Sequence, residues 1–402
     1  MESEKSWVET WGMAHAALSA MSFASKKRTL RLVWSTAISG EKIRLRLCNK
    51  YAKHPVEIAS VTLAPCDPNG SIPATNAITP LTFGGKTAFA IQAGETLVSD
   101  EADFSTVFGS YLCANVYVTK GKLTSGNYIN SASLVNMAGD GTRTLHTAHK
   151  KRWKDAVITA VSKLLGMTLH SPIPLFQAVE LLNGDGAASI ECFGDSLTQQ
   201  CFWTAPFEQR IRSLYPGRYS VINKGIGGNR IWRDTGRLPL KGFFGTKALE
   251  RIPDDIFAYE GIGFVVFCLG INDYLQPGTI AASKAEAVTV EEVARGVTQL
   301  ADMLRARGLR TVGMNYLPVG LSADATPQKS EIGLRLNQWL ETQTLFDAFV
   351  DVYTPFVSPD DAALPNAAYI GKDKTHPNTA GGAAIAGAFD YDIFAPALTQ
   401  HS

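Results

Sequence analysis

The chain has 402 residues, of which 45% are hydrophobic, so it can supply enough apolar surface for two or three globular domains. Its 38 lysines and arginines nearly balance its 37 aspartates and glutamates, which leaves a formal net charge of +1. So small a charge creates no overall field, which argues against nucleic acid, an anionic membrane surface or a polyanionic substrate as partners. The longest apolar run, around residues 262–269, is far shorter than the roughly 18 residues of a membrane-spanning helix.

The N-terminal residues, Met1 to Trp7, are charged and contain no apolar segment of the kind that signal peptides carry. We therefore expect no signal peptide and a cytoplasmic location. The six cysteines occur mostly in apolar contexts and show no paired C-x-x-C spacing. This pattern indicates buried free thiols and neither a zinc site nor a disulfide framework.

Residues 29–135 consist of short alternating runs separated by Gly, Pro, Asn and Asp. Residues 42–47, Lys-Ile-Arg-Leu-Arg-Leu, alternate strictly, as a half-exposed antiparallel strand should. Similar runs occur at residues 29–35, 56–63, 87–91 and 111–118. The pattern predicts a β-sandwich, of jelly-roll type. The side chains of Arg31, Arg44 and Arg46 could form a charged ligand patch, but solvated strand faces explain them more simply.

A connecting region, residues 146–175, follows the sandwich. Its apolar residues fall on one face of a helix that begins with a basic run, at positions 157, 158, 161, 164 and 165. Such a helix could bind a membrane surface or act as a lid, although packing at the domain junction is the simpler interpretation. His146 and His149 have nearly the spacing of metal ligands but lack carboxylate or cysteine neighbours, so we expect no metal.

Strands then alternate with helical patterns to the end of the chain. Strands are expected at residues 189–193, 219–223, 264–269 and 311–316, and helices at 290–304, 332–340 and 379–388. This alternation predicts a three-layer α/β/α fold with a parallel sheet. We therefore divide the chain into a β-sandwich domain, residues 1–185 with a helical insertion near 150–167, and a second domain, residues 186–402.

Four polar turns in the second domain carry residue types suited to catalysis. They are Gly194–Thr198, the glycine-rich Gly225–Asn229, Gly270–Asp273 and Asp373–Asn378. Gly-Asp-Ser alone would be read as a helix cap, but the carboxyl ends of parallel strands open on one edge of a sheet. The four turns can therefore converge around Ser196.

Together these turns resemble the motifs of the SGNH, or GDSL-type, hydrolase superfamily. Ser196 lies in Gly-Asp-Ser-Leu, Gly228 in Asn-x-Gly-Ile-Gly-Gly, Asn272 in Gly-x-Asn-Asp and His376 in Asp-x-x-His. The resemblance covers residues from about 187 to the C-terminus. It implies a flavodoxin-like fold and the activity of a serine esterase, lipase or carbohydrate deacetylase.

Two further features bear on this resemblance. Gln199 and Gln200 stand where relatives commonly have Asp and Gly, which leaves the nucleophile intact but changes the contacts beside it. The N-terminal run Trp7–Trp11 resembles the opening of bacterial two-domain esterases, in which a sandwich abuts the catalytic domain. Such sandwiches bind carbohydrate, shape the rim of the active site, mediate oligomers or serve as structural companions, and the sequence leaves these roles open.

Catalytic roles follow from what each group can do. The Ser196 hydroxyl needs a base, for which His376 is the candidate, and Asp373 on the same loop can orient the imidazole. The backbone N–H groups of Ser196 and Gly228 and the side-chain amide of Asn272 are the candidate oxyanion hole. Asp195 and Asp273 are expected to brace the turns rather than react.

The segment from Asn229 to Ile252 is long for a connection in such a fold, and long loops at the active edge of a sheet are usually functional. We predict that it forms a substrate wall. Its side chains Arg230, Trp232 and Arg233 are the candidate substrate-binding residues.

We therefore predict a serine ester hydrolase that works through an acyl-enzyme without a metal or organic cofactor. The favoured substrate is a small-molecule or oligosaccharide ester, either an O-acetylated carbohydrate or another short-chain acyl ester. A lipase or acyltransferase with the same nucleophile is one alternative. A carbohydrate-binding protein with a vestigial hydrolase site is the other. The sequence predicts no nucleic-acid partner and no membrane span, and it leaves open whether the protein forms a homo-oligomer.

Overall fold

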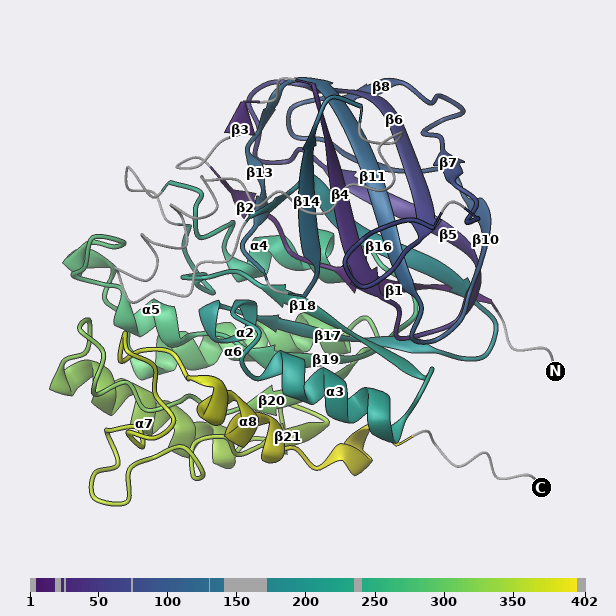
Figure 1. Cartoon of the computed structure of the whole chain (residues 1–402). Helices are drawn as coiled ribbons and strands as arrows, with labels where there is room; N and C mark the ends of the chain where they lie inside the picture. Colours follow the sequence, from purple (N-terminus) through teal and green to yellow (C-terminus); the bar gives the residue numbers. More distant parts are fainter. Residues whose placement is uncertain are drawn as a thin grey trace, which may run out of the picture.

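The computed structural model describes residues 5–18, 23–24, 27–73, 75–129, 131–140, 172–234 and 241–395. The predicted helical insertion near residues 150–167, together with His146 and His149, lies outside the described residues. Figure 1 shows a β-rich N-terminal region packed onto a second region in which helices flank a sheet.

Antiparallel strands form two main sheets in the N-terminal region, as predicted. The first sheet runs in the order β1 (Ser6–Gly12), β16 (Phe176–Asn183), β5 (Gly40–Cys48) and β10 (Ala102–Thr106), and β9 (Thr96–Val98) also pairs with β5. The second runs in the order β14 (Ser133–Ala138), β4 (Arg28–Ser35), β11 (Tyr111–Lys120), β6 (Val56–Pro65) and β7 (Thr79–Leu81), and β8 (Phe89–Ile91) pairs with β6. Because buried side chains from both sheets share one core, the region is a β-sandwich.

Two smaller sheets complete the sandwich region. One pairs β12 (Lys122–Leu123) with β3 (Phe23–Ala24), and the other has the order β15 (Ile173–Pro174), β13 (Ser125–Asn127) and β2 (Ala16–Ala17). Strands β2 and β13 of the three-stranded sheet reach the second region, where Ala17 donates to the Gly242 carbonyl and Asn127 to the Gly225 carbonyl.

The predicted alternation in β5 is present, but its basic side chains are not solvated. Ile43, Leu45 and Leu47 are buried in the sandwich core. On the other face, Arg44 and Arg46 are mostly buried and form ion pairs with Glu180 of β16 at 2.7 and 2.6 Å. Arg31 of β4 is only 3% exposed and donates to the side chain of Asn115. The expectation of solvated arginines is therefore wrong, because these side chains have buried hydrogen-bonding partners.

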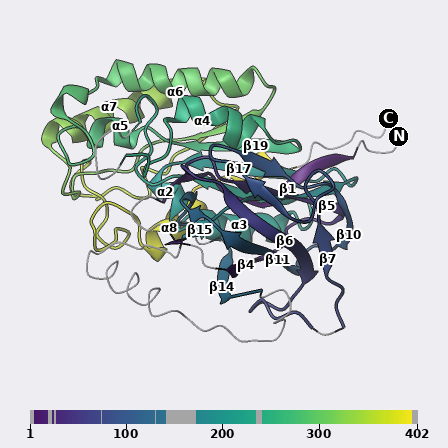
Figure 2. The same cartoon turned by 90° about the horizontal axis from the view of Figure 1, so that it is seen from above.

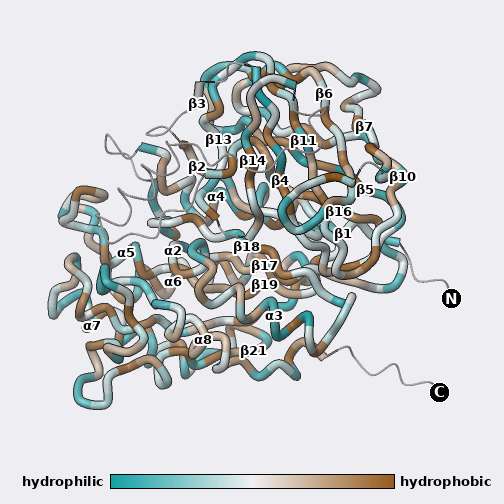
Figure 3. Tube along the Cα trace, in the orientation of Figure 1, coloured by the Kyte–Doolittle hydropathy of each residue, from teal (hydrophilic) through white to brown (hydrophobic). Residues whose placement is uncertain are grey.

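The second region contains a five-stranded, fully parallel sheet, which confirms the predicted α/β class. Its order is β18 (Tyr219–Gly225), β17 (Ala188–Gly194), β19 (Ile262–Cys268), β20 (Arg310–Met314) and β21 (Ala348–Val350). Numbered along the chain, this is the order 2-1-3-4-5 of flavodoxin-like folds, in which ligands bind beyond the carboxyl ends of the strands near the first and third strands. Figure 3 shows that the central strands β17 and β19 are predominantly hydrophobic.

Helices cover both faces of this sheet (Figures 1 and 2). One face carries α3 (Thr204–Leu214) and α8 (Thr379–Gly387), and the other carries α4 (Ala248–Ile252), α5 (Ile271–Leu275), α6 (Val290–Arg305) and α7 (Pro327–Glu341). The α6 helix matches the helix predicted at residues 290–304. Thr289 and Glu292 form a capping box at its start, and a buried stripe from Val290 to Leu304 faces the core. None of the helices in the described ranges has the length and apolar character that crossing a bilayer requires.

The two regions meet along the edge strand of the parallel sheet. Met13, just beyond β1, forms a parallel bridge with Asn223 of β18. The last sandwich strand ends at Asn183 and the first strand of the parallel sheet begins at Ala188. The domain boundary predicted at residues 185 and 186 falls within the turn between them and remains a prediction.

Candidate active site

Ser196 begins the short helix α2 (Ser196–Gln199) immediately after the central strand β17. Asp195 caps this helix, since its side chain accepts the N–H of Leu197 at 3.0 Å. The Ser196 hydroxyl therefore lies at the carboxyl edge of the sheet, beside the switch point between β17 and β19.

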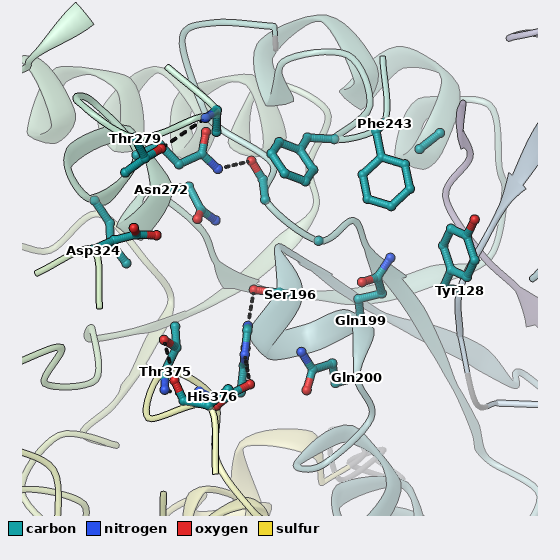
Figure 4. A pocket seen from close by; sticks show the side chains of 18 of the residues that line it. Tyr128, Ser196, Gln199, Gln200, Phe243, Asn272, Thr279, Asp324, Thr375 and His376 are labelled. Carbon is teal, nitrogen blue, oxygen red and sulfur yellow. Dashed lines mark hydrogen bonds and ion pairs between the residues drawn. The ribbon is translucent and has the colours of Figure 1, made fainter. Parts of the chain in front are cut away.

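His376 lies within hydrogen-bonding distance of this hydroxyl, as Figure 4 shows: its Nε2 is 2.8 Å from Ser196 Oγ. The other ring nitrogen, Nδ1, lies 2.8 Å from Asp373 Oδ2. When Nδ1 donates its proton to Asp373, the lone pair of Nε2 faces the serine hydroxyl. This is the geometry of a nucleophile, a base and a group that orients the base.

The loop around His376 is tightly constrained. Asp373 Oδ1 accepts the backbone N–H groups of Thr375 and His376 at 3.1 and 3.0 Å, and Gly371 donates to the His376 carbonyl at 2.7 Å. Partial burial acts to raise the pKa of Asp373, but hydrogen bonds from the His376 ring and from the backbone outweigh it and hold that pKa below its usual value. Asp373 is therefore a stable carboxylate partner for the imidazole.

Gly228 and Asn272 line the same cavity as Ser196. Gly228 has φ of +72°, and a Cβ there would lie 2.6 Å from the ring of Phe244, so both the backbone and the neighbourhood favour glycine. The Asn272 amide donates to Asp195 Oδ2 at 3.0 Å and to the Asn229 carbonyl at 3.2 Å. Because both amide hydrogens have acceptors, a substrate carbonyl would have to share one of them.

Two buried carboxylates brace these turns. Burial raises the pKa of Asp195 to about 7, against the lowering effect of the Leu197 N–H. Burial likewise raises the pKa of Asp273 to about 6, and this side chain accepts the backbone N–H groups of Ile231 and Trp232 at 2.8 and 3.2 Å. Their side-chain hydrogen bonds go to the turns and to Asn272, not to the Ser196 hydroxyl.

A buried arginine that the sequence analysis did not single out joins two of the turns. Arg251 donates to the Gly194 carbonyl at 2.8 Å, to the Lys224 carbonyl at 2.9 Å and to Asn229 Oδ1 at 2.9 Å. It is 1% exposed and pairs with Asp255. Arg251 comes from the long segment predicted to form a substrate wall, and no local pattern distinguishes it from the surface arginines.

The three candidate substrate-binding residues do not line this cavity. Arg230 is buried, with its guanidinium bonded to Glu286 at 2.9 Å and to the Asp234 carbonyl. Trp232 donates to the Glu292 carbonyl at 2.9 Å, and Arg233 is exposed. The structure therefore gives no support to substrate contact by these side chains, because Arg230 is paired with Glu286 and Trp232 packs against α6.

The cavity beside Ser196 has a volume of about 530 Å³. Its lining is mostly apolar and contains no Lys or Arg among the described residues. It comprises Ala16, Asn127, Tyr128, Ser196, Gln199, Gln200, Gly227, Gly228, Phe243, Phe244, Asn272, Leu275, Gln276, Thr279, Ile280, Ala281, Asp324, Asp373, Thr375 and His376. Phe243 and Phe244 belong to the predicted substrate wall, whereas the sandwich residues in this lining were not predicted.

Gln199, one of the two departures from the motif of relatives, contacts the sandwich. Its Nε2 donates to Asn127 Oδ1, while Asn127 Nδ2 donates to the carbonyls of Ala14 and Gly225 at 2.9 Å each. Asn127 is 1% exposed. The helix that carries Ser196 is thus joined directly to strand β13 of the sandwich, a contact that local sequence patterns do not reveal.

No group of three or more His, Cys, Asp and Glu side chains is placed to hold a metal ion in the parts of the chain that the structure describes. The arrangement of Ser196, His376 and Asp373 offers nucleophilic and acid–base chemistry from side chains alone.

Comparisons with known proteins bear on the family of the second region. The sequence model of the GDSL-like lipase/acylhydrolase family matches residues 192–384. A comparison with curated proteins finds no match for the sequence.

Similar solved structures include a putative acylhydrolase from Bacteroides fragilis, at 20% identity and a TM-score of 0.36, covering 50% of this chain and 83% of that one. A GDSL-like lipase from Bacteroides thetaiotaomicron has 18% identity and a TM-score of 0.36, covering 50% and 84%. An acetylxylan esterase from Geobacillus stearothermophilus has 20% identity and a TM-score of 0.37, covering 50% and 92%. At such low values these likenesses do not identify a substrate. From the family match, residues 192–384 form a GDSL-like lipase/acylhydrolase domain, a carboxylic ester hydrolase.

Proposed function

We propose that Ser196, His376 and Asp373 form the catalytic triad of this ester hydrolase. The observation that carries the proposal is the 2.8 Å contact between Ser196 Oγ and His376 Nε2, with Asp373 oriented on the opposite ring nitrogen. A serine hydroxyl is a weak nucleophile near neutral pH, so a base in direct contact with it is the feature that catalysis requires.

The reaction then runs in two halves. Ser196 Oγ bonds to the ester carbonyl carbon while its proton passes to His376 Nε2, and the carbonyl oxygen becomes an oxyanion. Collapse of this intermediate breaks the bond to the alcohol oxygen, which leaves with the proton from His376. Water then attacks the acyl-enzyme, again giving its proton to His376, and the carboxylic acid leaves as Ser196 regains its hydrogen.

The backbone N–H groups of Ser196 and Gly228, with the amide of Asn272, are the proposed donors to the oxyanion. Each such donor is commonly worth about 3–4 kcal/mol of activation free energy. Asp195 supports this role because it accepts from the Asn272 amide and so holds it near Ser196.

For the substrate, we propose a neutral ester, either with a short acyl chain on a simple alcohol or with an acetyl group on a carbohydrate. The absence of Lys and Arg from the described cavity lining argues against an anionic substrate. Thr279, Asp324 and Thr375 could bind hydroxyl groups of a sugar, whereas the mostly apolar remainder suits an acyl chain. Arg230 and Trp232, which the sequence suggested as substrate-binding residues, lie outside the cavity lining and give no support to the sugar proposal.

The first experiment compares the wild type with Ser196→Ala on p-nitrophenyl acetate and on an acetylated xylo-oligosaccharide. We expect kcat to fall roughly 10⁴- to 10⁶-fold, since removal of a triad nucleophile has effects of this size. Ser213→Ala, which changes an exposed serine of α3, is the control and should keep the wild-type rate. Wild-type activity in Ser196→Ala would refute the triad. Sugar binding without any ester turnover by the wild type would favour a carbohydrate-binding protein, and transfer to sugars in preference to water would favour an acyltransferase.

A further inference from the structure

The cavity extends from Ser196 in two directions that differ in chemistry. In Figure 4, His376 and Thr375 lie on one side of Ser196, and Phe243 and Tyr128 lie on the other. The first side offers hydroxyl and imidazole groups. The second is formed by aromatic rings, so the two sides suit different parts of one ester.

The aromatic side is built by both domains. We call it the aromatic wall, and it consists of Ala16 of β2, Tyr128 directly after β13, and Phe243 and Phe244 of the long segment after β18. The ring centroids of Tyr128 and Phe243 are 5.8 Å apart, and those of Phe243 and Phe244 are 5.6 Å apart. Such spacings are typical of rings in mutual contact.

The aromatic wall is held rigidly next to the nucleophile. Asn127, the residue before Tyr128, bonds to Gln199 of the Ser196 helix and to the Gly225 carbonyl at the end of β18. The backbone N–H of Ala17 donates to the Gly242 carbonyl at 3.0 Å, and Asn229 Nδ2 donates to the Phe244 carbonyl at 2.8 Å. A slot built in this way needs little ordering when a ligand enters, which favours binding.

The direction of proton transfer decides which part of the ester meets this wall. His376 must protonate the leaving alcohol, so the alcohol belongs on the side of Ser196 that His376 occupies. The acyl chain then points away from His376, toward Phe244, which packs against the proposed oxyanion donor Gly228. We propose that the aromatic wall binds an uncharged acyl chain longer than acetyl, so that the sandwich domain forms part of the acyl site and Tyr128 and Phe243 set its specificity. This inference rests on the proposed serine-esterase function.

The expected signature is a dependence of kcat/KM on acyl length. A buried methylene is worth about a fourfold gain, so butyrate and hexanoate esters should exceed acetate progressively until the slot is filled. Removal of a ring from the wall should flatten this dependence, because the added methylenes would then lie in a wider, wetter space.

The experiment measures kcat/KM for p-nitrophenyl acetate, butyrate, hexanoate and octanoate with wild type, Tyr128→Ala, Tyr128→Phe and Phe243→Ala. We expect the hexanoate-to-acetate ratio to fall at least tenfold in both alanine variants and to be retained in Tyr128→Phe, which keeps the ring. Phe108→Ala, which removes an exposed aromatic ring elsewhere on the sandwich, is the control and should keep the wild-type ratio. Phe243 lies in a loop and is half-buried, so Phe243→Ala decides the matter even if Tyr128→Ala does not fold.

A second series keeps the acetyl group and varies the alcohol from methanol to hexanol. The proposal is overturned if the alanine variants alter discrimination among alcohols instead of acyl groups, if they leave the acyl ratio unchanged, or if the wild type prefers acetate to every longer chain. These outcomes leave Ser196-dependent hydrolysis intact. By contrast, hydrolysis that persists in Ser196→Ala would refute the proposed function itself.

Discussion

At the scale of single residues, Gly228 is the position in the proposed site where the structure most strictly requires glycine. Its φ of +72° is costly for any residue with a Cβ, and the Phe244 ring occupies the space that a Cβ would need. Alanine at this position would have to shift either the ring or the backbone N–H group that we propose as an oxyanion donor.

We therefore expect Gly228→Ala to lower kcat/KM about 100-fold, in line with the loss of one oxyanion donor. Gly308→Ala is the matched control, since Gly308 has φ of +69° but a Cβ there would meet no atom within 4 Å. Backbone strain should cost each variant about 1 kcal/mol of stability. The clash with Phe244 adds to this cost only in Gly228→Ala, and only this variant should show slower turnover. Equal kcat/KM values in the two variants would mean that Gly228 serves only to form the turn and not as an oxyanion donor.

The proposed catalytic residues could be named from the sequence because each lies in a short motif at the end of a strand or start of a helix. Ser196, Gly228, Asn272 and His376 are brought together by the parallel sheet. The substrate residues could not be predicted in this way. Arg230, for example, is of a residue type that often binds ligands. Its place beside Glu286 depends on tertiary packing, which the local sequence does not reveal.

At the scale of elements, long periodic segments were predictable and very short ones were not. The stripe that predicts a helix at residues 290–304 corresponds to α6 (Val290–Arg305), and the alternation at 42–47 lies within β5. Strands β2 and β13 have two and three residues, too few to show any period. The contact of Asn127 with Gln199 therefore emerges only in the folded chain.

This contact leads to a prediction for α2. A carboxylate in Gln199→Glu would face Asn127 Oδ1, an acceptor whose own amide group is already bonded to two carbonyls. Two acceptors in contact in a partly buried position should cost about 1–3 kcal/mol. We expect a lower melting temperature and a lower kcat/KM, measured by thermal unfolding and ester hydrolysis. Gln200→Glu is the control with the same change one residue later, and equal melting temperatures for the two variants would show that the contact contributes nothing.

At the scale of the whole molecule, a fully buried charge cluster connects the sandwich to the parallel sheet. Lys224 Nζ of β18 lies 2.8 Å from Glu9 Oε1 of β1 and 3.9 Å from Glu191 Oε2 of β17, and all three side chains are 0% exposed. Lys224 also lies 4.0 Å from the ring centroid of Tyr259. Burial raises the pKa of Glu9 and that of Glu191, which Lys224 opposes. At the junction, one cation therefore lies between two carboxylates.

Replacement of that cation should destabilise the junction between the two domains. We expect Lys224→Met to lower the free energy of unfolding by about 3–5 kcal/mol, because it leaves buried carboxylates without a positive partner. Lys224 lowers the pKa values of Glu9 and Glu191, so its loss should raise them further. The folded variant then holds protons that the unfolded chain releases above about pH 4.5, and its stability falls more steeply as pH rises than that of the wild type. The loss should accordingly be larger at pH 8 than at pH 5.5 in urea unfolding, and the added change Glu9→Gln should recover part of it. Lys5→Met, which breaks the exposed pair with Glu41, should have little effect. If both lysine variants proved equally stable at both pH values, the cluster would not be what holds the sandwich to the catalytic domain.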